Sequence, residues 1–82
     1  MGHDIAERVQ QIVAEQLGIP RAEVSTRASF AELGADSLAV VELLLAVEEA
    51  FDLEISDADT LQLRTVGDAI SHVMTVRRRE AQ

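Results

Sequence analysis

The residues with the clearest chemical potential lie together in the stretch Gly34-Ala35-Asp36-Ser37-Leu38. A serine hydroxyl can hold a covalent group through its oxygen. The aspartate before it is a good helix N-cap, because its carboxylate can accept hydrogen bonds from free N–H groups in the first helical turn. The run that follows is rich in Leu, Ala and Glu and has no Gly or Pro, which predicts a helix over 37–51. The positive end of that helix would favour a phosphate group on Ser37.

The predicted helix 37–51 divides into two unlike halves when successive residues are rotated by roughly 100°. One half forms a complete apolar core face, made of Ala39, Val40, Leu43, Leu44, Ala46, Val47, Ala50 and Phe51. The other half mixes the serine with three apolar residues and three acids, namely Ser37, Leu38, Val41, Glu42, Leu45, Glu48 and Glu49. If this half is exposed, it is an apolar strip rimmed by acids that suits docking to a basic partner. If the helix is buried on two sides, the same apolar residues are core, and the residues alone leave both interpretations open.

The stretch Leu33-Gly34-Ala35-Asp36-Ser37-Leu38, followed by Val41-Glu42-Leu43 and Val47-Glu48-Glu49-Ala50-Phe51, resembles the acyl carrier protein family. The resemblance extends from about Ile5 to Met74. It implies that Ser37 carries 4′-phosphopantetheine, with Asp36 and Leu38 flanking the attachment point. It also implies that the following helix docks partner enzymes, through Leu38, Val41, Glu42, Leu45, Glu48 and Glu49.

The resemblance implies a carrier that enzymes modify and use, not an enzyme. Such a protein delivers acyl thioesters to acyl-transfer and condensing enzymes after a phosphopantetheinyl transferase has loaded it. The acidic helix favours fatty-acid biosynthesis. Three departures from the family pattern keep a discrete polyketide or other specialised carrier as the alternative: Ala39, Ser56 and the arginine-rich end. A non-catalytic interaction module with the same fold is a further alternative.

Composition excludes several other classes of protein. The 82 residues predict one domain over 1–82 with one small core, and 48% of them are hydrophobic. The net charge is −8, and no basic residue lies between Arg27 and Arg64, so nucleic-acid binding is disfavoured and basic partners are favoured. The absence of cysteine excludes disulfides and a thiol nucleophile, and no metal site is expected. Without a signal peptide or a membrane-length apolar run, we expect a cytoplasmic monomer with no membrane insertion.

Three further helices are predicted around 37–51, which gives an all-α fold: a small bundle of three main helices plus one short helix. Apolar periodicity predicts helices over 4–17 and 66–77, and Ser56-Asp57-Ala58-Asp59 predicts a short helix over 57–61. A long ordered loop joins the first two helices, pinned by Ile19, Val24, Phe30 and Leu33, and Ser29-Phe30-Ala31-Glu32 predicts a capping box within it. By the resemblance, the short helix helps to gate the acyl chain. The run Arg77-Arg78-Arg79 is interpreted as a solvated helix end.

A serine hydrolase is the enzyme alternative, and the sequence argues against it. Ser37 lies outside a Gly-x-Ser-x-Gly elbow, no βα scaffold is predicted, and both histidines lie near the chain ends. The acids between Asp52 and Asp59 lack the spacing of a calcium loop. The small residues Ala39, Ala46 and Ala50 leave room for an acyl chain within the bundle, although no pocket can be placed from the sequence.

Overall fold

Four α-helices form the bundle in this computed structural model, which describes residues 2–80 and side chains from Ile5 onward, so the side chain of His3 lies outside it. The helices are α1 (Gly2–Leu17), α2 (Ser37–Phe51), α3 (Asp57–Gln62) and α4 (Val66–Glu80), and the loop after α1 contains a 3-10 turn, η1 (Arg21–Glu23). The predicted all-α class is confirmed. The helix predicted from residue 4 begins at Gly2, and the one predicted to end at residue 77 continues to Glu80.

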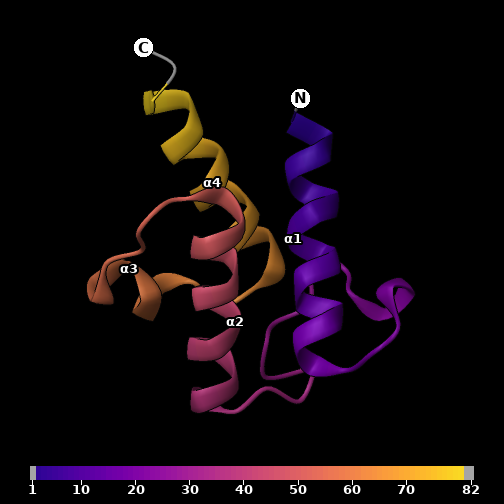
Figure 1. Cartoon of the computed structure of the whole chain (residues 1–82). Helices are drawn as coiled ribbons and strands as arrows, with labels where there is room; N and C mark the ends of the chain where they lie inside the picture. Colours follow the sequence, from indigo (N-terminus) through magenta and orange to yellow (C-terminus); the bar gives the residue numbers. More distant parts are fainter. Residues whose placement is uncertain (1, 81–82) are drawn as a thin grey trace.

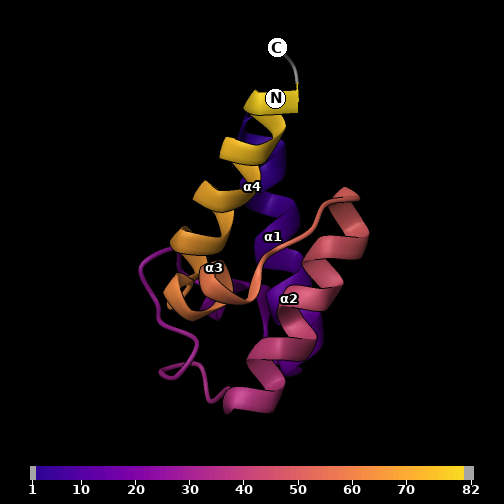
Figure 2. The same ribbon diagram turned by 90° about the vertical axis from the view of Figure 1, so that its left-hand side faces the viewer.

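Helices α2 and α4 both pack against α1 and run in the opposite direction to it (Figures 1 and 2). The start of α1 and the end of α4 therefore lie at the same end of the bundle, and α2 begins at the other end. The short α3 lies beside α2 and α4 (Figure 1). This arrangement places the start of α2, with Ser37, next to the long loop that follows α1 (Figure 2).

The core is wholly apolar, since no polar or charged residue of the described side chains is buried. Each main helix contributes, and the loops add Val24, Phe30, Leu53, Ile55 and Leu63. The helix residues of the core are Val9, Ile12, Val13, Ala14, Leu43, Leu44, Val47, Phe51, Val66, Ala69, Ile70 and Val73. On α4, helical spacing predicts a buried face of Val66, Ile70, Val73 and Met74. In the structure Ala69 is buried as well, and Met74 is only partly buried.

Side-chain caps begin the two helices that follow loops in the second half of the chain. The Ser56 hydroxyl accepts a hydrogen bond from the Asp59 backbone at 3.1 Å and begins α3. At α4 the pair is reciprocal: the Thr65 hydroxyl accepts from the Asp68 backbone, and the Asp68 carboxylate accepts from the backbones of Thr65 and Arg64, all at 3.0 Å. The two backbone donors lower the pKa of Asp68 below its usual value.

Loop residues 26–30 are hydrogen-bonded to residues 64–67, a pairing that the sequence did not predict. The Phe30 N–H donates to the Arg64 carbonyl at 2.9 Å, the Val66 N–H to Ala28 at 3.1 Å, and the Gly67 N–H to Thr26 at 2.9 Å. Ser29 and Thr65 form an isolated antiparallel bridge at the same place. The long loop is therefore fastened to the start of α4.

The burial pattern of α2 predicts very different effects for two leucines close together on it. Leu43 is 1% exposed and Leu45 is 52% exposed. Leu43→Ala should lower the free energy of unfolding by ~2–5 kcal/mol, because it leaves a cavity in the core. Leu45→Ala is the matched control and should change it by less than about 0.5 kcal/mol. Urea unfolding followed by circular dichroism measures both, and similar losses for the two variants would mean that α2 packs on a different face.

The capping pair at α4 predicts a specific pH dependence of stability. Because the pKa of Asp68 is lower in the folded protein than in the unfolded chain, its stabilising contribution is present above about pH 4. It is lost as the pH falls through the folded pKa. Asp68→Asn should therefore lower the urea midpoint near neutral pH, and the gap to the unaltered protein should close in acid. The control Glu7→Gln removes an exposed carboxylate from α1; an equal loss in that variant, or a gap at all pH values, contradicts the assignment.

Candidate functional site

Ser37 is the first residue of α2, and Asp36 holds it there as the N-cap. Asp36 has extended backbone angles, with φ −84° and ψ −178°, and its carboxylate accepts a hydrogen bond from the Ala39 N–H at 2.8 Å. Ser37 itself is exposed. The serine hydroxyl is therefore accessible at the positive end of a helix, where a phosphate is electrostatically favoured.

The loop before Asp36 is built from local hydrogen bonds around Phe30. The Ser29 hydroxyl accepts from the Glu32 N–H and the Glu32 carboxylate accepts from the Ser29 N–H, both at 3.0 Å, which closes the predicted capping box. Hydrogen bonds from the Ser29 backbone and hydroxyl lower the pKa of Glu32. The Ala35 N–H donates to the carbonyl of Phe30 at 3.0 Å, and the Phe30 side chain is buried.

Gly34 completes this loop with a φ of +91°, a conformation that side-chain-bearing residues rarely adopt. Its N–H donates to the Ala31 carbonyl at 3.0 Å. The chain can thus reverse within one turn and enter α2 at Asp36. The position of Ser37 is therefore set by a buried phenylalanine and a tight turn.

The three apolar residues in the mixed half of α2 are exposed, which decides the question that the sequence left open. Leu38 is 65% exposed, Val41 45% and Leu45 52%. The interpretation in which they are core residues of a helix buried on two sides is wrong. Sequence reasoning missed Leu61 of α3, which is 74% exposed and extends the apolar surface beyond α2; its place in a short, weakly periodic helix gave no signal for its exposure.

The three acids of the same half have different surroundings. Glu42 and Glu49 are exposed, whereas Glu48 is half-buried. The Glu48 carboxylate accepts a hydrogen bond from the Ile55 N–H at 3.1 Å, and its backbone carbonyl accepts from the Leu53 N–H at 3.0 Å. Glu48 therefore holds the loop between α2 and α3, a structural role that the helical periodicity could not indicate.

An apolar cavity of about 420 Å³ opens beside Ser37, between the loop, the first turns of α2, and α3. Its size is in the range of small-molecule sites. Its lining consists of Ser29, Phe30, Ala31, Ala35, Asp36, Ser37, Val40, Val41, Thr60, Leu61, Leu63 and Arg64. None of Ala39, Ala46 and Ala50 lines it. This cavity is therefore not beside those small residues, where the sequence suggested room for an acyl chain.

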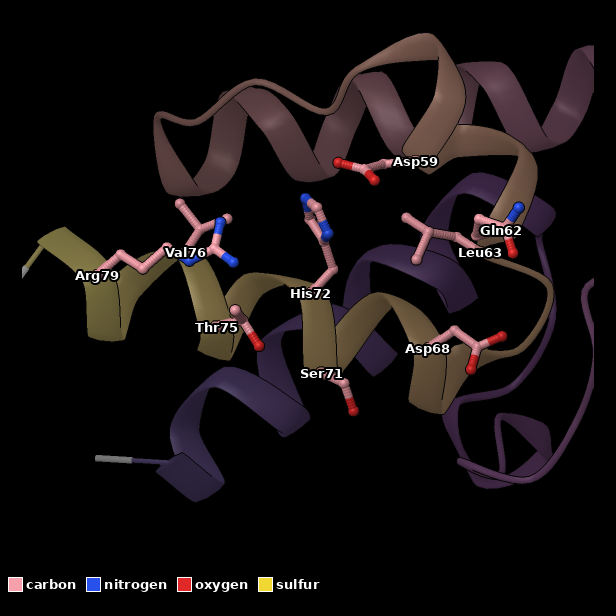
Figure 3. Close-up of a pocket in the computed structure, with 9 residues that line it drawn as sticks. All are labelled: Asp59, Gln62, Leu63, Asp68, Ser71, His72, Thr75, Val76 and Arg79. Atoms are coloured by element: carbon pink, nitrogen blue, oxygen red, sulfur yellow. The ribbon is translucent and has the colours of Figure 1, made fainter.

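A second cavity, of about 330 Å³, lies between α3 and α4 and is lined mainly by polar side chains (Figure 3). His72 projects into it from α4, half-buried, and its Nε2 atom has no hydrogen-bond partner among the described residues. The linings of the two cavities share only Leu63. The structure therefore does not bring His72 together with Ser37, as a serine hydrolase would require.

The described part of the chain has neither a cluster of metal-binding side chains nor a helix suited to a membrane. No three or more His, Asp or Glu side chains there are grouped so that they could hold a metal ion. None of the described helices has the length and apolar character needed to cross a membrane.

The residues around Ser37 are suited to a covalently attached phosphopantetheine arm. The Ser37 residue is exposed, the helix terminus favours a phosphate, and an apolar cavity lies directly beside the serine. Ser37 would hold the arm at a fixed place, and the cavity would keep the cargo out of contact with water.

Comparison with known proteins agrees with this geometry. The model of the phosphopantetheine attachment site family matches residues 7–73. Among solved structures, an acyl carrier protein from Enterococcus faecalis, described for its high thermal stability, is 29% identical with a TM-score of 0.75, over 92% of this chain and 96% of that one. BlmI, a type II acyl carrier protein from Streptomyces verticillus involved in bleomycin biosynthesis, is 31% identical with a TM-score of 0.79, over 92% of this chain and 88% of that one.

The matched region includes the capped serine, the exposed half of α2 and the cavity beside them. The chain therefore belongs to the acyl carrier proteins, the family that holds 4′-phosphopantetheine and presents cargo to enzymes without being a catalyst itself.

Proposed function

We propose that Ser37 is the attachment residue, and that the protein carries acyl groups as thioesters on the phosphopantetheine arm attached there. The observation that carries this proposal is the exposed serine on the first turn of a capped helix, at the edge of an apolar cavity. The arm, when attached, supplies the terminal thiol that the chain itself lacks, since it has no cysteine.

Each residue of the motif has a distinct part in this proposal. Ser37 Oγ is the nucleophile that attacks the pyrophosphate of coenzyme A. The serine becomes esterified by the phosphopantetheinyl group and adenosine 3′,5′-bisphosphate leaves, while a phosphopantetheinyl transferase provides the base and metal. Asp36 fixes the helix start and so the direction of the serine. Leu38 is exposed next to it and provides an apolar contact for the transferase.

We propose that the exposed half of α2 is the docking face for partner enzymes, which include acyl-transfer and condensing enzymes as well as the transferase. Leu38, Val41 and Leu45 supply its apolar strip, and Glu42 and Glu49 lie exposed beside them. Glu48 contributes charge while it holds the next loop. An acidic rim around an apolar strip favours fast and transient docking of basic surfaces.

The pathway we propose first is fatty-acid biosynthesis, with the protein acting as a cytoplasmic monomer. The acidic α2 and the largely apolar cavity support this choice. A specialised pathway, such as discrete polyketide synthesis, is the second candidate, because the chain is 31% identical to a carrier involved in bleomycin biosynthesis. The departures at Ala39, Ser56 and Arg77–Arg79 point the same way.

The attachment proposal predicts a defined change of mass. Incubation with coenzyme A and a broad-specificity phosphopantetheinyl transferase should add one phosphopantetheine, measured by intact mass spectrometry. Ser37→Ala should abolish the gain while the protein stays folded, because the exposed hydroxyl makes no core contact. If folded protein that starts unmodified gains no mass, the carrier role is contradicted and the interaction-module alternative is favoured.

The docking proposal predicts a salt-dependent loss of affinity for Glu42→Lys. Reversing one exposed charge on the rim should weaken binding of the transferase by about three- to tenfold at low salt, and by less at high salt. Titration calorimetry measures the dissociation constant. Glu7→Lys makes the same change of net charge at an exposed position on α1 and should have little effect on binding. Equal losses of affinity for both variants would indicate a general charge effect and no docking face.

A further inference from the structure

The carboxylate of Glu48 belongs to the exposed half of α2, yet the partner that it has among the described residues lies in the next loop. It accepts a hydrogen bond from the Ile55 N–H at 3.1 Å, seven positions along the chain. The backbone carbonyl of Glu48 accepts separately from the N–H groups of Asp52 and Leu53. If the carboxylate moved away from Ile55, these two backbone bonds would still end α2 as they do now.

The surroundings of this carboxylate are electrostatically unfavourable. The last turn of α2 contains no basic residue, so no charge there offsets the partial negative charge of the helix C-terminus. Two further acids follow Glu48 within four positions. Arg77 lies over the Phe51 ring at 5.8 Å, but its guanidinium pairs with Glu80 at 3.7 Å. A cation supplied by another molecule would therefore be a stronger partner for Glu48 than the neutral N–H that it has.

The hydrogen bond to Ile55 lies at the start of α3, and α3 has few other attachments. None of its residues is buried, whereas Ile55 just before it is. The end of α3 is held in another way, because the Arg64 carbonyl accepts from the Phe30 N–H at 2.9 Å. Two residues of α3 line the cavity beside Ser37. Loss of the bond to Glu48 would thus free one end of a cavity wall while the other end stays fastened.

From this arrangement we propose that Glu48 couples the docking of a partner enzyme to the opening of the cavity. A guanidinium or ammonium group of the docked enzyme takes the carboxylate from the Ile55 N–H, since a hydrogen-bonded ion pair is stronger than a bond from a neutral donor. The start of α3 then moves away from α2, and the cargo becomes accessible. This coupling rests on the proposed docking face and gives it a regulatory role. Glu49, which is exposed, contributes charge alone.

The first test needs no partner. Glu48→Ala should speed the hydrogen exchange of the Ile55, Asp59 and Thr60 amides roughly three- to tenfold, as expected for the loss of one hydrogen bond. The last two amides are bonded within the first turn of α3 and report on that helix. Glu49→Ala is the matched control and should leave all three rates unchanged. Unchanged rates in Glu48→Ala, or an equal acceleration throughout α1, would overturn the inference.

The second test uses the phosphopantetheinyl transferase as the partner. It is done with coenzyme A in a Ser37→Ala background, so that the complex persists without transfer, and calorimetry gives the saturating concentration. Binding should speed the exchange of the Ile55 amide by roughly three- to tenfold. Glu48→Gln keeps an acceptor for this N–H but offers a partner no charge, so its Ile55 amide should keep its exchange rate on binding. Glu49→Gln should behave like the protein with both acids.

A residue that merely holds the loop would not produce this difference between the bound and free states. Ile55 exchange that does not rise on binding when Glu48 is present, or that rises equally in Glu48→Gln, would overturn the coupling. Failure of the proposed function is distinguishable from these results. Absence of binding in calorimetry contradicts the docking face, and native Ser37 that gains no mass contradicts the carrier role, whereas the coupling alone fails with binding and mass gain both intact.

Discussion

The pairing between residues 26–30 and 64–67 is the constraint on which the site depends. Three backbone hydrogen bonds fasten a long loop to the start of α4. Through Phe30 they set the wall of the cavity, and through the turn at Gly34 they set where α2 begins. Gly67 makes the approach possible, because a Cβ atom there would lie 2.9 Å from the Thr26 carbonyl oxygen. A long connection in a small domain stays ordered only if it makes contacts of its own of this kind.

Helix α2 has one buried and one exposed apolar face. One face buries Leu43, Leu44, Val47 and Phe51 against the rest of the core. The other leaves Leu38, Val41 and Leu45 exposed to water, so these side chains contribute little hydrophobic free energy to folding. The proposed docking of partner enzymes would cover these exposed apolar residues beside Ser37.

Much of this could be predicted from the sequence because it is local. Helical periodicity and the side chains that cap α2, α3 and α4, namely Asp36, Ser56 and Thr65, depend on residues within a few positions of one another. The place of Ser37 at the start of a capped helix also followed from a short motif. What could not be predicted depends on contacts between distant residues. Examples are the position of the cavity, the hydrogen bond from Ile55 to Glu48, and the neighbourhood of Arg64 and Phe30.

The cavity is closed on one side by the least anchored element of the fold. Helix α3 has six residues and none of them is buried, so its place depends on the Ser56 cap and on Leu53, Ile55 and Leu63 at its flanks. Thr60 and Leu61, which line the cavity, belong to this helix. Segments with few buried contacts open at the lowest free-energy cost. Of the elements around the cavity, α3 would therefore open at the lowest cost to admit the proposed cargo, while α1, α2 and α4 keep their packing.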